Sequence, residues 1–153
     1  MPLQPGDPAP TVAASNQRGT EVAPSFEEPT VVYFYPADDT PGCTTEAEEF
    51  GRELDAYRDA GVTVYGISVD GVDSHAAFAE KHGIEFDLLA DPDGEVASAF
   101  DVERGPGGAT ARTTFVLVGD EVYDVYTGVD PAGHARTVLG DLLDAGVVDL
   151  ETG

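Results

Sequence analysis

A short apolar strand that runs directly into an amphipathic helix constrains the fold of this chain more than any other feature. Residues 30–35 read TVVYFY, a β-branched and aromatic run that is typical of a buried strand, and Pro36 ends it. Apolar residues then recur at helical spacing until Gly61 supplies a stop. These apolar positions are Ala47, Phe50, Leu54 and Tyr57. The pattern predicts a strand, a short loop and a helix.

The only cysteine of the chain, Cys43, falls at the start of this predicted helix. Thr40 is expected to be the N-cap, and Pro41 suits the first helical position because its missing N–H would have no partner there. A thiol in the first turn faces unpaired backbone N–H groups and the positive end of the helix dipole. Both favour the thiolate, which is the nucleophilic form of cysteine. The sequence therefore predicts a reactive thiol at position 43.

The residues around Cys43 resemble a known motif. The pattern Pro36-x-x-x-Thr40-x-x-Cys43 is similar to the peroxidatic motif of the peroxiredoxins. The longer run YPADDTPGCTTEAEEF resembles the peroxiredoxin Q, or bacterioferritin comigratory protein, subfamily, and the resemblance extends from GDPAP at residues 6–10 to the last predicted helix. It implies a thioredoxin-like fold. It also implies a thiol-dependent peroxidase that reduces hydrogen peroxide and organic hydroperoxides through a cysteine sulfenic acid, with no cofactor and no metal.

A thiolate at position 43 requires a nearby cation. A free thiol has a pKa of about 8.5, and a helix terminus contributes only ~0.3–1 kcal/mol towards ionising it. An arginine about 4 Å away contributes up to about 4 kcal/mol at an effective dielectric constant of about 20. Arg112, directly before the apolar run 113–118, resembles the family's arginine that precedes a strand beside the active cysteine. The other arginines fit less well: Arg52 and Arg58 lie farther along the Cys43 helix, and Arg18, Arg104 and Arg136 fall in a turn, a loop and the last helix.

The resemblance implies a role for each residue of the predicted site. Cys43 would attack one peroxide oxygen, and Arg112 would stabilise the thiolate and the polarised peroxide. The Thr40 hydroxyl and the backbone N–H of Cys43 would orient the peroxide, while Pro36 would shield the pocket from water. Glu46 matches a family position that helps to hold the arginine or its surroundings. Purely structural roles stay open: a buried apolar thiol, an ion-pairing arginine, an N-capping threonine and a glutamate favoured by the helix dipole.

Cys43 has no second cysteine to pair with, which excludes an internal disulfide and every multi-cysteine metal site. Many members of the subfamily carry a resolving cysteine five positions after the first, where this chain has Glu48. We therefore expect a one-cysteine enzyme recycled by an external thiol, which is a thioredoxin, a glutaredoxin-like protein or a small thiol. A disulfide between two molecules stays open, and we expect a monomer or a weak homodimer.

Two other classes of function stay open. In the first, Cys43 oxidises and signals to a partner, as a redox sensor or binding module without rapid turnover. The second is a thiol–disulfide oxidoreductase of the same fold, which normally needs Cys-x-x-Cys, but Glu46 occupies the second position.

Other residue types that often mark sites are expected to be structural here. The three histidines, His75, His82 and His134, are expected at the surface on or near helices, without a ligand cluster. The glycine-rich segment Gly105–Gly108 lacks the GK[ST] ending of a phosphate loop, so it is interpreted as a connection.

The chain is strongly acidic. Its 30 Asp and Glu residues against 7 Lys and Arg residues give a formal net charge of −23. Disorder is disfavoured because 41% of the residues are hydrophobic and occur in periodic runs, and nucleic-acid binding is disfavoured because there is no basic patch. The composition resembles that of proteins from salt-loving archaea, since a Debye length of about 3 Å at 1 M salt would screen the self-repulsion. We therefore predict a halophilic, haloarchaeal protein that loosens at low salt.

Length and hydropathy limit the remaining possibilities. The 153 residues suit one domain, spanning 1–153. No apolar stretch approaches the roughly 20 residues of a membrane helix, and residues 1–5 contain no secretory apolar region. We therefore expect a cytoplasmic protein without membrane or nucleic-acid partners.

The order of the other predicted elements suits the same fold. Helical and strand signals alternate as βαβ and then ββα, which favours an α/β, thioredoxin-like fold with a central mixed β-sheet flanked by helices and an N-terminal β-hairpin extension. The other predicted strands are a hairpin at 11–14 and 20–22, and single strands at 62–69, near 86–89, at 113–118 and at 122–127. The other predicted helices are one capped by Asp73 or Ser74 and ending at Gly83, and a brief one to about Phe100. A last helix is marked by Val138, Leu139, Leu142 and Leu143 and ends at Gly146.

Overall fold

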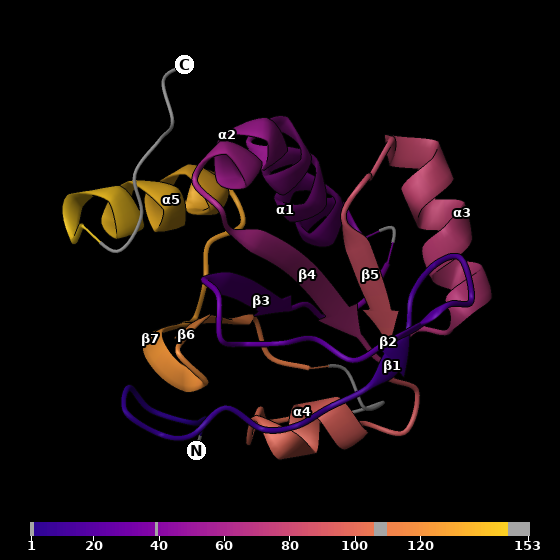
Figure 1. Cartoon of the computed structure of the whole chain (residues 1–153). Helices are drawn as coiled ribbons and strands as arrows, with labels where there is room; N and C mark the ends of the chain where they lie inside the picture. Colours follow the sequence, from indigo (N-terminus) through magenta and orange to yellow (C-terminus); the bar gives the residue numbers. More distant parts are fainter. Residues whose placement is uncertain (1, 39, 106–109, 147–153) are drawn as a thin grey trace.

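The computed structural model describes residues 2–38, 40–105 and 110–146, so the predicted connection at Gly105–Gly108 falls outside it except for its first residue. A five-stranded sheet runs through the molecule in the order β5–β4–β3–β6–β7 (Figure 1). Strand β3 at its centre pairs in parallel with β4 and antiparallel with β6, so the predicted central mixed sheet is confirmed. The strands of this sheet are β3 (Thr30–Phe34), β4 (Thr63–Ser68), β5 (Asp87–Ala90), β6 (Thr113–Val118) and β7 (Glu121–Thr127).

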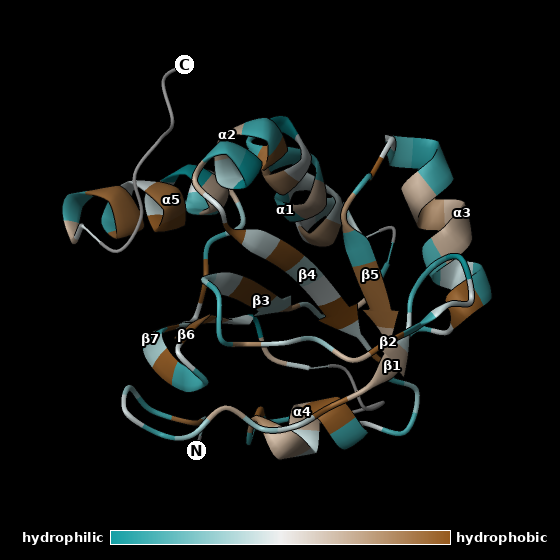
Figure 2. Ribbon diagram, in the orientation of Figure 1, coloured by the Kyte–Doolittle hydropathy of each residue, from teal (hydrophilic) through white to brown (hydrophobic). Residues whose placement is uncertain are grey.

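Helices flank both faces of the sheet. They are α1 (Pro41–Arg52), α2 (Leu54–Asp59), α3 (Val72–His82), α4 (Glu95–Ala99) and α5 (His134–Asp144). One core lies between the sheet and α1, α2, α3 and α5, and a second lies between the other face and α4. Successive residues of a strand point to opposite faces, so Val31 and Tyr33 enter the first core while Val32 and Phe34 enter the second. Figure 2 shows hydrophobic residues along the central strands and hydrophilic residues on the outer sides of the helices.

The predicted N-terminal hairpin is confirmed as β1 (Ala14–Ser15) and β2 (Glu21–Val22). Its turn lies against the outer strand β5, where the Gln17 amide donates to the Phe86 carbonyl and accepts from the Leu88 N–H, both at 2.9 Å. The side chain thus pairs with backbone groups of an edge strand that would otherwise be open to pairing with another chain.

The helix predicted to reach Gly61 is interrupted. It forms two helices, α1 and α2, that are separated at Glu53. The break follows Gly51, and glycine is a poor helix former because it loses much backbone freedom on folding. Leu54 and Tyr57 are nevertheless buried, so the apolar spacing predicted the buried face correctly.

Helix α3 begins earlier than the sequence predicts, because Gly71 rather than Asp73 or Ser74 is its N-cap. The Ser74 hydroxyl donates to Asp38 at 2.8 Å, so it is engaged away from the helix end. Asp73 lies in the first turn, where the helix dipole favours a negative charge. The predicted end of this helix at Gly83 is confirmed.

The expectation that all three histidines lie at the surface is wrong for two of them. His75 is 0% exposed and His134 is 7% exposed. The ring nitrogens of His75 face Asp38 and Leu89, and His134 Nε2 lies 2.9 Å from Thr114 Oγ1. These partners offset the cost of burying a polar ring, which periodicity alone does not reveal.

Candidate active site

Cys43 lies in the first turn of α1, directly after the loop that follows the central strand. Thr40 is the N-cap residue and Pro41 is the first helical residue, as the sequence predicts. The thiol is free and the residue is 1% exposed. The sulfur therefore lies at a buried helix N-terminus, a place that is electrostatically favourable for an anion.

Strand pairing brings Arg112 to this thiol. Arg112 directly precedes β6, whose first residues pair with the end of β3 close to the loop. A hydrogen bond from the Thr110 hydroxyl to the Tyr35 carbonyl, at 2.8 Å, further ties the segment before β6 to the end of β3. As a result, Arg112 Nη2 donates to Cys43 Sγ across 3.3 Å.

Glu46, one turn beyond the cysteine, binds the other side of the guanidinium. Arg112 Nη1 donates to Glu46 Oε1 at 2.9 Å, and the carboxylate side chain is 1% exposed. Burial raises the pKa of Glu46 to about 7, although the charge and hydrogen bond of Arg112 act in the opposite direction. Glu46 therefore changes charge in the neutral pH range while it contacts the residue that faces the thiol. We refer to Cys43, Glu46 and Arg112 as the cysteine cluster.

Two buried polar atoms in this region have no hydrogen-bond partner within the described part of the chain. They are the second carboxylate oxygen of Glu46, Oε2, and the hydroxyl of Tyr33 on β3. Burial raises the pKa of Tyr33 well above its ordinary value, and the neighbouring charge of Glu46 raises it further, so the phenol stays neutral. The surroundings of Cys43 thus contain a carboxylate oxygen and a phenol hydroxyl that are both available to form a hydrogen bond.

Gly42 leaves room for the arginine. A Cβ atom at position 42 would lie 2.6 Å from Arg112 Nη2 and 3.5 Å from Pro131 Cγ. The first distance is shorter than real Cβ contacts, so any other residue would displace the guanidinium. Sequence reasoning missed Gly42, since its only signal is its place beside Cys43.

Thr40 and Pro36 adjoin the cysteine cluster through the loop. The Thr40 hydroxyl donates to the Ala37 carbonyl at 3.0 Å and makes no side-chain cap, while the Thr40 carbonyl accepts the Thr44 N–H at 2.8 Å. Both Thr40 and Pro36 are partly exposed. The structure thus joins three of the five predicted site residues by direct contacts and places the other two at the edge of that group.

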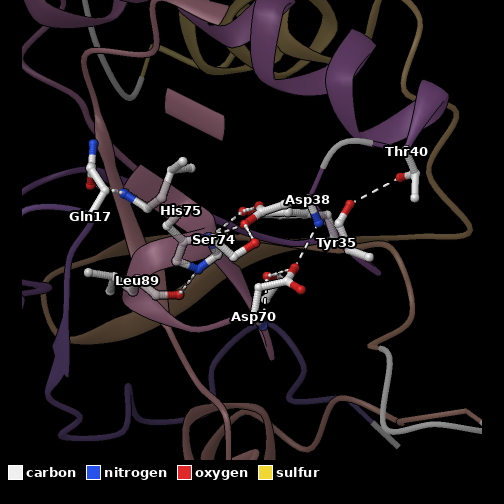
Figure 3. A network of polar contacts seen from close by, with 11 residues as sticks. Gln17, Tyr35, Asp38, Thr40, Asp70, Ser74, His75 and Leu89 are labelled. Atoms are coloured by element: carbon white, nitrogen blue, oxygen red, sulfur yellow. Dashed lines mark hydrogen bonds and ion pairs between the residues drawn. The ribbon is translucent and has the colours of Figure 1, made fainter. Parts of the chain in front are cut away.

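A second buried polar group, centred on Asp38 and His75, was missed from the sequence (Figure 3). These residues are 37 positions apart, and no local pattern links them.

The wider structure adds two observations. Among residues 2–38, 40–105 and 110–146, no group of three or more His, Cys, Asp or Glu side chains is arranged to hold a metal ion. None of the helices in these ranges is long and apolar enough to span a membrane.

Comparison with known proteins identifies the family. The sequence profile of the AhpC/TSA family matches residues 5–123. Peroxiredoxin Bcp of Xanthomonas campestris pv. campestris is 41% identical over 119 residues, which cover 73% of this chain and 74% of that protein. The crystal structure of peroxidoxin BcpB from Mycobacterium tuberculosis superimposes with a TM-score of 0.86 at 35% identity, covering 93% of this chain and 97% of that one.

A second solved structure belongs to the bacterioferritin comigratory protein of Xanthomonas campestris, described in trapped intermediate and ligand complexes that concern its alkyl peroxide reduction activity. It superimposes with a TM-score of 0.80 at 34% identity, and covers 88% of this chain and 91% of that one. The family profile, these relatives and the motif around Cys43 agree, and the chain belongs to the AhpC/TSA family, beside peroxiredoxins of the bacterioferritin comigratory protein type.

Proposed function

We propose that this chain, a thiol-dependent peroxidase of the AhpC/TSA family, reduces hydrogen peroxide and organic hydroperoxides at Cys43. The observation that carries the proposal is the 3.3 Å contact between Arg112 Nη2 and the sulfur of a buried cysteine at a helix N-terminus. A fixed positive charge there stabilises the thiolate and the negative charge that develops on the peroxide. The alkyl peroxide reduction studied in the Xanthomonas campestris relative supports the inclusion of organic hydroperoxides.

In the proposed reaction, the Cys43 thiolate attacks one peroxide oxygen. An S–O bond forms as the O–O bond breaks, and the leaving hydroxide or alkoxide takes up a proton to depart as water or an alcohol. The sulfur loses two electrons and becomes a sulfenic acid, while the peroxide gains them. Arg112 keeps its charge throughout, so its role is electrostatic.

The remaining site residues position the peroxide. Because the Thr40 hydroxyl proton is directed to the Ala37 carbonyl, the Thr40 oxygen is left to accept a hydrogen bond from the peroxide O–H. The backbone N–H of Cys43 donates to the same substrate, Pro36 keeps water from the pocket, and Glu46 orients the guanidinium.

An external thiol completes the proposed cycle, since Cys43 is the only cysteine in the chain. The first thiol condenses with the sulfenic acid to give a mixed disulfide and water, and a second thiol releases reduced Cys43. A thioredoxin, a glutaredoxin-like protein or a small thiol would supply both. We place the enzyme in the cytoplasm as one domain, acting as a monomer or weak homodimer.

The charge of the chain extends the proposal to its environment. A formal net charge of −23 suits a haloarchaeal, halophilic protein in which molar salt screens the repulsion. Circular dichroism during dialysis from molar KCl into salt-free buffer tests this. Loss of helical signal is expected, and a fully retained spectrum would contradict the halophilic assignment.

Oxidation of the reduced protein by hydrogen peroxide in molar KCl tests the catalytic proposal, with Cys43 followed by mass spectrometry. We expect rapid addition of one oxygen to Cys43 and turnover when a thiol reductant is present. Cys43→Ser should abolish both. Oxidation no faster than that of a free thiol would overturn the peroxidase proposal and favour a redox sensor or binding module.

A further inference from the structure

A buried ion pair lies beside the active-site loop. The His75 side chain is 0% exposed, with Nδ1 2.7 Å from Asp38 Oδ2 and Nε2 3.0 Å from the Leu89 carbonyl oxygen. The carbonyl and the carboxylate are both acceptors, so each ring nitrogen donates and the ring is positively charged. Burial raises the pKa of Asp38, but the hydrogen bond and charge of His75, together with the hydrogen bonds of Tyr35 and Ser74, outweigh burial, and the pKa lies below its ordinary value. Asp38 is therefore a carboxylate paired with a charged His75.

Further hydrogen bonds hold Asp38 from several sides. Its Oδ1 accepts from the Tyr35 hydroxyl at 2.7 Å, and its Oδ2 also accepts from the Ser74 hydroxyl at 2.8 Å. Its backbone N–H donates to Asp70 Oδ2 at 2.7 Å, and that oxygen also accepts from the Ser68 hydroxyl at 2.7 Å. Figure 3 shows Asp38 between His75 and Ser74 on one side and Asp70 on the other. We refer to Tyr35, Asp38, Asp70, Ser74 and His75 as the Asp38 network.

The Asp38 network is coupled to the reacting residues through a very short stretch of chain. Asp38 lies two residues before Thr40, and it follows Ala37, whose carbonyl accepts the Thr40 hydroxyl at 3.0 Å. Thr40 in turn is the N-cap of the helix whose first turn contains Cys43. A shift of Asp38 would therefore move both the Thr40 oxygen and the start of α1.

We propose that the Asp38–His75 ion pair positions the loop so that Thr40 and the first turn of α1 hold a peroxide in line with the Cys43 sulfur. Asp38 and His75 are positioning residues, which act through Thr40 and the helix start. This inference rests on the proposed function, because it takes Cys43 as the thiol that reacts with peroxide. In an enzyme active site, a displacement of the reacting groups by about 1 Å can lower the reaction rate by roughly 100-fold.

Two reactions of the same thiol test the proposal. Attack on hydrogen peroxide depends on an oriented substrate, whereas alkylation by iodoacetamide does not require Thr40. In His75→Asn, we expect the peroxide rate constant to fall by about tenfold or more, and the alkylation rate constant to change by less than about twofold. Ser74→Ala removes a single hydrogen bond to the Asp38 carboxylate, from a donor on the exposed side of the network, and should lower the ratio of the two rate constants by about two- to threefold.

His134→Asn is the matched control. It alters another buried histidine, which binds Thr114 rather than the loop, so it should lower stability and leave the ratio unchanged. A purely structural role for His75 would make His75→Asn behave like this control.

The outcomes separate the two proposals. The positioning role would be overturned if the ratio of the peroxide rate constant to the alkylation rate constant stayed unchanged in His75→Asn. This includes the case in which both rate constants fall in parallel. If His75→Asn does not fold, Ser74→Ala decides alone, and an unchanged ratio counts against the proposal. A wild-type protein that reacts with peroxide no faster than a free thiol would defeat the proposed function itself.

Discussion

The cysteine cluster and the Asp38 network are both buried and polar, but they differ in how completely their atoms are paired. In the Asp38 network, both carboxylate oxygens of Asp38 and both ring nitrogens of His75 have partners. In the cysteine cluster, Glu46 Oε2 has no partner among the described residues.

This difference separates rigidity from reactivity. A fully paired buried network is costly to disrupt, because each broken bond leaves a desolvated group or charge behind. An incompletely paired group carries that cost in the resting state and gains when a substrate supplies the missing contacts. We therefore expect changes in the Asp38 network to act mainly on stability and orientation, and changes in the cysteine cluster to act mainly on the reaction of the thiol.

The largest effect on stability is expected for Asp38→Ala. The change leaves the charged His75 ring buried without its carboxylate, which costs about 3–5 kcal/mol of unfolding free energy. Urea unfolding in molar KCl measures this loss. The control is Asp141→Ala, since Asp141 also accepts a tyrosine hydroxyl, from Tyr126 at 2.6 Å, but at an exposed site. Similar losses in the two variants would show that the Asp38 network has no special rigidity.

Arg112→Ala should have the largest effect on the reaction. Within the described residues, Arg112 is the only cation in contact with the Cys43 sulfur. Its loss is expected to lower the peroxide rate constant by about 10²–10³-fold, which is the usual effect of removing one hydrogen-bond donor that stabilises a transition state. Peroxide oxidation followed by mass spectrometry checks it. Arg136→Ala is the control, because Arg136 is 84% exposed and pairs with Glu53. An unchanged rate in Arg112→Ala would remove the observation on which the peroxidase mechanism rests.

Glu46 should make stability depend on pH. Burial raises its pKa in the folded protein from 4.5 to about 7, so the folded state binds this proton more tightly than the unfolded state. The resulting stabilisation is fully present below about pH 4.5 and is lost as the pH rises through about 7, a loss of about 3 kcal/mol. Unfolding measured at pH 5 and pH 8.5 should therefore show a smaller difference in Glu46→Gln than in the wild type. Equal differences would contradict the raised pKa of this buried carboxyl.

The sequence predicted the sheet and the hairpin because each leaves a local pattern, whereas Arg112 was placed beside Cys43 through the resemblance to the peroxiredoxin family. Strand runs, a helix start at Pro41 and an arginine before an apolar strand are all readable along the chain. Their catalytic roles stay predictions. The pairing of Asp38 with His75 depends instead on how α3 packs beside the loop, so no spacing rule could find it.

Gly42 gives the finest test of the cysteine cluster, because it lies in the same helix as a second glycine in open space. A Cβ at position 42 would meet Arg112 Nη2 at 2.6 Å, whereas a Cβ at Gly51 would have no atom within 4 Å. The guanidinium is the far end of a flexible side chain, so in Gly42→Ala it can move aside at little cost in stability, but it then leaves the Cys43 sulfur. We expect the peroxide rate constant to fall by about tenfold, or about 1.4 kcal/mol in activation free energy, with little change in the free energy of unfolding.

Gly51→Ala is the control. It should leave the peroxide rate constant unchanged and stabilise the protein by about 0.5–1 kcal/mol, because alanine is the better helix former. A Gly42→Ala protein that reacts as fast as the wild type would show that the 3.3 Å contact is not needed for the chemistry, even with the arginine still present.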